Sequence, residues 1–395
     1  MRLRWACRHR PAVTHRSFGG RAMCQLVIVQ KRRRWGRCNA VGSTRMAPIP
    51  DSPPVRLAEI VAALSLGIDL GFSQPMEHVL RQCLIALRVA DRIGLDDNAR
   101  AAVYYSALLV NVGCHSDAHE QAKWFGDDIA LKATKFDYEP RSAREALGMV
   151  RLLGAGGSAL HRIRTGVEFA VSGRHDVDDM LAQHAALAKQ LADRLELPAQ
   201  VGAALACSYE RWDGKGWPGK VAGADASVAS RIVQLAEYVE VAYRTGGTTA
   251  ARALAERRSG SQFDPTLVRV LCDHATEVFD GLSDVGTWQM VIAAEPALTV
   301  VLSGAGVDRA LRAIAEFVDL KSPYMLGHST AVAELAASAG RHLNLAGDEV
   351  TTLRRAGLVH EFGRLGVSNS IWDKPAPLGA GEWERVRLHP YYAER

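Results

Sequence analysis

The segment DLKSPYMLGH, residues 319–328, repeats the segment DLGFSQPMEH, residues 69–78, after a shift of 250 residues. The same shift superimposes three further pairs of identical residues: Leu95 and Leu345, Leu108 and Leu358, and Gly113 and Gly363. A shift that stays constant over such a length indicates an internal duplication. We therefore expect two copies of one fold, arranged in tandem along the chain.

The two copies differ at one adjacent pair of positions. Val110 and Asn111 of the first copy correspond to His360 and Glu361 of the second. An imidazole beside a carboxylate can bind a divalent metal ion, whereas a valine and a neutral amide cannot replace that pair. We therefore expect only the second copy to keep metal ligands.

The length of the chain agrees with a duplication. At about 100–200 residues per domain, 395 residues predict two or three domains. We place a basic extension at residues 1–54, the first copy at residues 55–284 and the second copy at residues 285–395.

The positive charge of the chain is concentrated at its beginning. Residues 1–50 contain 12 Lys or Arg and no Asp or Glu, whereas the remaining residues contain 36 Lys or Arg against 43 Asp or Glu. A basic segment without acidic residues is typical of a nucleic-acid-binding arm or a transit peptide. We favour a third interpretation, a disordered extension that precedes a working start at Met46.

Composition excludes several other classes of protein. No apolar run approaches the roughly 20 residues that cross a bilayer, so we expect a soluble, cytoplasmic protein without a membrane partner. The seven cysteines are odd in number and form no CxxC pair, which argues against a secreted disulfide scaffold and a zinc ribbon. No segment predicts a nucleic-acid-binding domain within this chain.

Helical periodicity dominates from Val55 onward, and the best candidate for a strand is residues 298–302. In the second copy, apolar residues recur at spacings of three and four together with His328: Val332, Leu335, Ala336, Ala339 and Leu343. The sequence therefore predicts an all-α fold of two helical bundles in which His328 faces inward. Residues 319–346 and 347–361 are expected to form an antiparallel helical pair.

Four residues of the second copy could form a metal site: His328, His360, Glu361 and His389. Imidazole nitrogens and a carboxylate held on neighbouring helices suit a divalent ion, which can activate a bound water for phosphoester hydrolysis. Lys374, in the segment IWDKPAPL, would add a positive charge for a phosphate oxygen. For each histidine alone, a packing role in the core is the simpler interpretation.

Two segments of the second copy, LVHEFGRLGVSNSIWDKPAPL at 358–378 and EWERVRLHP at 382–390, resemble the HD-GYP branch of the HD metal-dependent phosphohydrolases. His360 matches the histidine of the signature His-Asp pair, and Glu361 stands in place of its aspartate. Lys374 matches the lysine thought to contact substrate phosphate, and His389 matches the next metal-binding histidine. His328 falls on the preceding helix. The resemblance implies that Glu361 and Lys374 are catalytic.

The first copy resembles the same family in a degenerate form. The segment YERWDGKGWPG, residues 209–219, is similar to the family's second signature, but Ser208 and Tyr209 occupy the positions of two histidines and Trp217 that of a tyrosine. His184 matches a metal-binding histidine, and Glu237 stands near the position of a final aspartate. We do not expect metal-dependent catalysis in this copy.

The resemblance implies a tandem HD-type phosphodiesterase that uses iron or manganese and hydrolyses a cyclic dinucleotide, usually cyclic di-GMP, or another phosphoester. The rest of the second signature would follow Arg395, so a truncated second copy with impaired activity is expected. The alternative is an inactive module that senses a nucleotide or binds a protein partner, and a homodimer is compatible with either function. A truncated product that folds poorly in its last hundred residues is a third hypothesis.

Overall fold

The described chain is helical almost throughout, as the sequence predicts. The computed structural model describes residues 54–137, 143–155, 158–169, 174–282, 286–296 and 299–394. The predicted basic extension, apart from Pro54, and the predicted boundary between residues 284 and 285 lie outside the described residues. Among the described helices, none is both long enough and apolar enough to cross a lipid bilayer.

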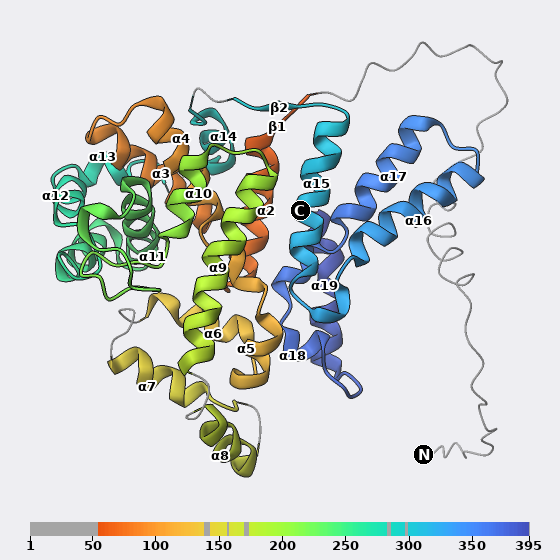
Figure 1. The fold of residues 1–395 in the computed structure, drawn as a ribbon, viewed down its shortest axis with the longest axis horizontal. Helices are drawn as coiled ribbons and strands as arrows, with labels where there is room; N and C mark the ends of the chain where they lie inside the picture. The colour runs from red at the N-terminus through yellow and green to blue at the C-terminus, as the bar shows by residue number, and fades with distance from the viewer. Residues whose placement is uncertain are drawn as a thin grey trace, which may run out of the picture. The chain divides into compact units, whose positions relative to one another are not determined.

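The first copy contains most of the helices in Figure 1. Its helices are α2 (Leu57–Gly71), α3 (His78–Arg92), α4 (Asp97–Leu109), α5 (Ala118–Phe125), α6 (Asp128–Ala133), α7 (Ala143–Leu152), α8 (Ala159–Glu168), α9 (Arg174–Arg194), α10 (Ala199–Ala206), α11 (Val228–Arg257), α12 (Pro265–Asp273) and α13 (Ala275–Phe279). Within the described residues of this copy, short 3₁₀ turns join the helices: η1 (Val112–His115), η2 (Thr134–Phe136) and η4 (Gly223–Asp225).

The second copy follows α14 (Thr287–Ala293) and a short strand, β2 (Val301–Leu302). Its elements are α15 (Ala305–Asp319), η5 (Pro323–Met325), α16 (His328–His342), α17 (Gly347–Val359), η6 (Phe362–Gly366), α18 (Asn369–Trp372) and α19 (Ala380–Glu394). Strand β2 pairs antiparallel with β1 (Val55–Arg56) at the start of the first copy. The predicted strand at 298–302 therefore exists, but only as these two residues within the described part.

The repeat in sequence is also a repeat in structure, because α16 and α17 keep the bounds of α3 and α4 after a shift of 250 residues. In both copies a buried aspartate fixes the start of the helix that begins with histidine. The Asp69 carboxylate accepts a hydrogen bond from the Val79 amide at 3.2 Å, and the Asp319 carboxylate accepts one from the Ser329 amide at 2.9 Å. Burial raises the pKa of both carboxyl groups, that of Asp69 to about 7.

The antiparallel pair predicted in the second copy exists as α16 and α17, which lie side by side in Figure 1. The predicted start at residue 319 is wrong, because α15 ends there and α16 begins only at His328, after η5. The face predicted to be buried is wrong, however, because Leu335 is 70% exposed and Leu343 60% exposed. The buried residues of α16 are instead small: Ser329, Ala333, Ala337 and Gly340. A Cβ added at Gly357 would lie 2.7 Å from the Ala333 Cα, so the two helices approach too closely for larger side chains.

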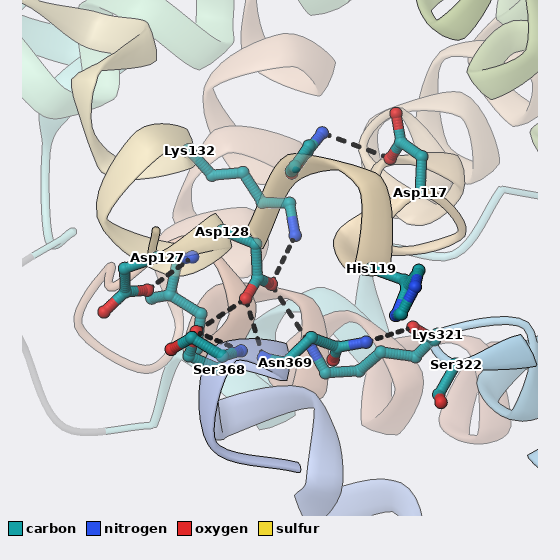
Figure 2. A network of polar contacts seen from close by, with 12 residues as sticks. Asp117, His119, Asp127, Asp128, Lys132, Lys321, Ser322, Ser368 and Asn369 are labelled. Atoms are coloured by element: carbon teal, nitrogen blue, oxygen red, sulfur yellow. Dashed lines mark hydrogen bonds and ion pairs between the residues drawn. The ribbon is translucent and has the colours of Figure 1, made fainter. Parts of the chain in front are cut away.

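The two copies are joined by a buried polar network around Asp128 (Figure 2). The Asp128 carboxylate accepts hydrogen bonds from Lys132 Nζ at 3.0 Å in the first copy and from Lys321 Nζ at 3.2 Å in the second. It also accepts hydrogen bonds from the Ser368 hydroxyl and the Asn369 backbone N–H, each at 2.8 Å. Burial opposes ionisation of Asp128, but the two ammonium groups hold its pKa far below the usual range. Burial lowers the pKa of Lys321 to about 8.

We expect Asp128→Asn to lower the free energy of unfolding by about 3–5 kcal/mol at pH 7, because two buried ammonium groups lose their shared carboxylate. Lys321→Met is the matched control and should cost less, since Lys132 still balances Asp128. Urea unfolding followed by circular dichroism measures both, and equal losses in the two variants would contradict the assignment.

The same network predicts how stability depends on pH. Because the pKa of Asp128 is depressed in the folded state, its contribution is complete above the unfolded pKa of about 4 and is lost as the pH falls further. The stability difference between the wild type and Asp128→Asn should therefore shrink steadily below about pH 4. A difference that stays constant from pH 7 to pH 3 would argue against an ionised Asp128.

Candidate metal centre

Three of the four predicted metal ligands converge in the second copy. His328 is the first residue of α16, His360 caps the end of α17, and Glu361 precedes η6. The Nε2 atoms of His328 and His360 are 3.3 Å apart. Glu361 Oε1 lies 3.6 Å from His328 Nε2 and 3.4 Å from His360 Nε2.

These separations fit ligands of a single ion. Metal–nitrogen and metal–oxygen bonds of about 2.0–2.2 Å place neighbouring ligand atoms roughly 3.0–3.5 Å apart in octahedral or tetrahedral geometry. Within the described parts of the chain, no other group of three His, Cys, Asp or Glu side chains gathers its ligand atoms this closely. The imidazoles of His328 and His360 are about one-third exposed, which leaves an approach for a water or a substrate, whereas Glu361 is largely buried.

The imidazole of His360 is oriented for metal binding by its own helix. Its Nδ1 lies 2.8 Å from the carbonyl oxygen of Gly357, which can only accept, so Nδ1 carries the proton and Nε2 keeps its lone pair for an ion. Hydrogen bonding to Glu361 raises the pKa of His360. Bound metal would compete with this proton.

Glu361 is kept ionised by its neighbours although it is largely buried. Burial opposes the charge, but hydrogen bonding to His360 and the positive charge of Arg364 hold the pKa of Glu361 below its usual value. Its Oε2 is buried without a hydrogen-bond partner, and the nearest cationic group is Arg364 Nη1 at 3.8 Å. A buried carboxylate oxygen without a partner is a position that a cation would stabilise.

Asp319 is a positioning residue for the first turn of α16, although the sequence pattern indicated only that it belongs to the repeat. Its carboxylate accepts hydrogen bonds from the Ser329 amide at 2.9 Å and the Ser329 hydroxyl at 2.6 Å. These bonds fix the first turn of α16 and therefore the place of His328. The signal was present in the sequence, because both copies have an aspartate nine residues before the helix-starting histidine.

His389, the fourth predicted ligand, lies on α19 close to the other three but outside their cluster. Its Nδ1 lies 2.6 Å from the Val386 carbonyl oxygen, and its ring meets the edge of Trp372 at 5.3 Å. The same Trp372 ring also contacts Arg364, whose guanidinium lies 4.2 Å from the ring centroid.

Two glycines show that His389 and His184 occupy equivalent places. A Cβ added at Gly363 would lie 1.9 Å from the carbonyl oxygen of His389, and one added at Gly113 would lie 2.3 Å from that of His184. In each copy, therefore, the histidine-bearing helix rests directly on the turn that follows the signature pair. His389 and His184 therefore occupy equivalent places in the two copies, a relation that the sequence analysis did not predict.

Lys374, the predicted phosphate ligand, is turned toward α19. Its Nζ donates to both carboxylate oxygens of Glu382, at 2.8 and 2.7 Å, and forms no hydrogen bond with His328, His360 or Glu361. The lysine is one-third exposed, so it could exchange this ion pair for a phosphate. Its role in substrate binding stays a prediction.

In the first copy, the side chains at the corresponding positions form hydrogen bonds and ion pairs with one another. His78 Nδ1 lies 2.5 Å from Glu240 Oε2, and the Asn111 amide donates to Glu237 Oε1 at 2.5 Å. Lys135 Nζ lies between Asn111 and Glu237 and donates to both. No feature of the sequence singled out Lys135, because its contacts come from residues distant along the chain.

The chain is similar to known phosphodiesterases, and part of its first copy matches a family model. A family model described as an HD domain matches residues 174–267. The chain is 28% identical over 344 residues to 3′3′-cGAMP-specific phosphodiesterase 3 of Vibrio cholerae, covering 86% of this chain and 75% of that protein. A cyclic di-GMP phosphodiesterase of Pseudomonas aeruginosa is 32% identical over 129 residues, which cover 32% of this chain and 31% of that protein.

A solved structure agrees with these relatives. The crystal structure of a cyclic GMP-AMP specific phosphodiesterase of V. cholerae matches with a TM-score of 0.65 and 27% identity, covering 86% of this chain and 78% of that one. The all-α fold predicted from the sequence is therefore confirmed both by the helices themselves and by this neighbour.

We expect Gly363→Ala to destabilise the protein by about 1–3 kcal/mol and to weaken metal binding, because the added methyl group must push α19 and His389 away from η6. Gly381→Ala, in α19 itself, is the control, since a Cβ added there meets no atom within 4 Å. The control should be neutral or more stable by up to about 1 kcal/mol. Thermal unfolding with and without manganese measures both, and equal behaviour of the two variants would refute the close contact.

Proposed function

We propose that the chain, which is similar to HD-domain phosphodiesterases, is a metal-dependent phosphodiesterase of cyclic dinucleotides whose metal centre lies in the second copy. The observation that carries the proposal is the convergence of His328, His360 and Glu361 at the spacing of ligands around one ion. The HD-domain phosphodiesterases that the chain resembles support a divalent metal.

The residues of the second copy have distinct parts in the proposed mechanism. His328, His360 and Glu361 would hold a divalent ion, with His389 as a further ligand from α19. Such an ion, when bound, supplies a water molecule of lowered pKa and polarises the phosphodiester. The chain itself contributes orientation: the Gly357 carbonyl fixes the His360 ring, and Asp319 fixes the start of α16.

Two finer points belong to the same proposal. A mixed set of imidazole and carboxylate ligands suits iron or manganese, and we propose one of these as the resident ion. The substrate is proposed to be cyclic di-GMP or a cyclic GMP-AMP, since the relatives are named for these compounds. Lys374 would bind a phosphate oxygen after releasing Glu382.

The decisive measurement is the metal content and hydrolytic activity of the full chain. We expect bound iron or manganese in the wild type, and loss of metal and at least about 100-fold loss of cyclic di-GMP and 3′3′-cGAMP hydrolysis in His360→Ala, since loss of an outer partner already costs about 10–100-fold. His342→Ala, on the exposed end of α16, is the control. Hydrolysis that persists in metal-free protein, or no hydrolysis of either compound with manganese, would exclude the proposal.

Glu361 bears on the rate of the proposed reaction. Its extra methylene, relative to the aspartate of the family signature, moves the carboxylate by roughly an ångström, and a misplacement of that size can cost up to about 100-fold in rate. We therefore expect Glu361→Asp to keep metal and to raise kcat. A slower Asp variant would show instead that the site is adapted to glutamate, and that the expected impairment does not originate at this residue.

A further inference from the structure

The first copy contains an internal cation at its former metal position. Lys135, in η2, donates from Nζ to Asn111 Oδ1 at 2.7 Å and to Glu237 Oε1 at 2.6 Å. Asn111 is the residue that the repeat superimposes on Glu361, one of the ligands in the second copy. The ammonium group of Lys135 therefore sits beside the position from which Glu361 would bind an ion.

The ammonium group of Lys135 is charged, and one of its N–H donors has no hydrogen-bond acceptor among the two bonds above. Burial opposes protonation, but attraction to Glu237 prevails and raises the pKa of Lys135. An ammonium group carries three N–H donors, and the two hydrogen bonds above use two of them. The third is left for an acceptor, and Lys135 Nζ also lies 5.7 Å from the ring centroid of Tyr209.

Lys135 lines a cavity of about 170 Å³ in the first copy. This volume is close to the roughly 150 Å³ of an engineered cavity that binds one benzene ring, so it suits one planar aromatic group. Most of its wall is apolar, and aromatic rings contribute to it: Phe72, Phe125, Tyr209, Trp217 and Tyr238. In nucleic-acid-binding proteins, bases stack on aromatic rings of this kind.

A buried polar atom in the same cavity also lacks a partner. Gln121 lines the cavity and is 5% exposed, and its Oε1 is buried without a hydrogen bond. Its Nε2 is already held by Asp117 at 3.1 Å, which fixes the amide so that the oxygen remains available as an acceptor. An N–H group on a ligand would satisfy this oxygen.

The remaining residues of the former metal site are not free to bind an ion. Val110 has no ligand atom, the amide of Asn111 carries no charge, and His78 is paired with Glu240. Glu237 is paired with Lys135 and Glu240 with Arg81. His184, which matches a metal-binding histidine of the family, is paired with Asp117 at 2.9 Å. A divalent cation would have to displace a buried ammonium group, which is costly.

We propose that the first copy is a metal-independent binding site for one nucleotide unit, in which the Lys135 ammonium group takes the place of the metal. The base lies among the aromatic rings and donates to Gln121, and the phosphate accepts the third N–H of Lys135. This inference does not rest on catalysis in the second copy, and it assigns the first copy a role as a sensor of nucleotides.

Binding of GMP and of AMP to the full chain in excess EDTA tests this proposal, with isothermal titration calorimetry as the measurement. We expect one of the two to bind at one site per chain without metal. Lys135→Met should weaken that binding at least tenfold. Because Lys135→Met leaves the Glu237 carboxylate unpaired, the double variant Lys135→Met/Glu237→Gln, which removes both charges, is measured beside it and should bind as weakly.

His360→Ala is the control that separates the two copies, because it removes a proposed ligand of the second copy and should bind nucleotide like the wild type. Binding that requires manganese, that disappears in His360→Ala, or that survives in the folded double variant would overturn the proposal. Failure of both nucleotides to bind in EDTA would overturn it as well. None of these results depends on whether the second copy hydrolyses cyclic dinucleotides.

Discussion

The proposed metal centre depends on a contact that leaves no room for a side chain. At Gly363 the turn after the signature pair lies directly against the backbone of α19, where even a Cβ would overlap the His389 carbonyl oxygen. The same contact joins Gly113 to His184 in the first copy. It sets how near the histidine-bearing helix comes to the ligand-bearing turn, and it is preserved in both copies although their ligands differ.

One scaffold therefore carries two different arrangements of charge. In the second copy the carboxylate of Glu361 faces two imidazoles and keeps a buried oxygen without a hydrogen-bond partner, a position that a bound cation would stabilise. In the first copy Lys135 supplies that cation from within the chain and neutralises Glu237. A change of a few side chains thus distinguishes the proposed metal site of the second copy from the first copy, where a lysine already neutralises the carboxylate.

The surroundings of the two copies also differ. Ile85 on α3 and Leu335 on α16 are equivalent by the repeat, yet Ile85 is completely buried and Leu335 is 70% exposed. Helices α11 to α14 pack on α3, whereas α16 packs chiefly on α17 and α15. The two copies are nonetheless joined through Asp128 and its two lysines, which bury charge at their junction and favour one relative placement of the helices.

The sequence by itself determined the duplication, the helical class, the start of α17, and the presence at His328, His360 and Glu361 of side chains that suit a metal ion, because these follow from local spacing and side-chain chemistry. Only the tertiary structure decided which apolar face is buried, since periodicity shows that a helix has such a face but not which neighbour covers it. The pairings of Lys135 with Glu237 and of Lys374 with Glu382 were also decided there. A long, flexible lysine can reach any carboxylate that the fold brings near it, and no local pattern records that choice.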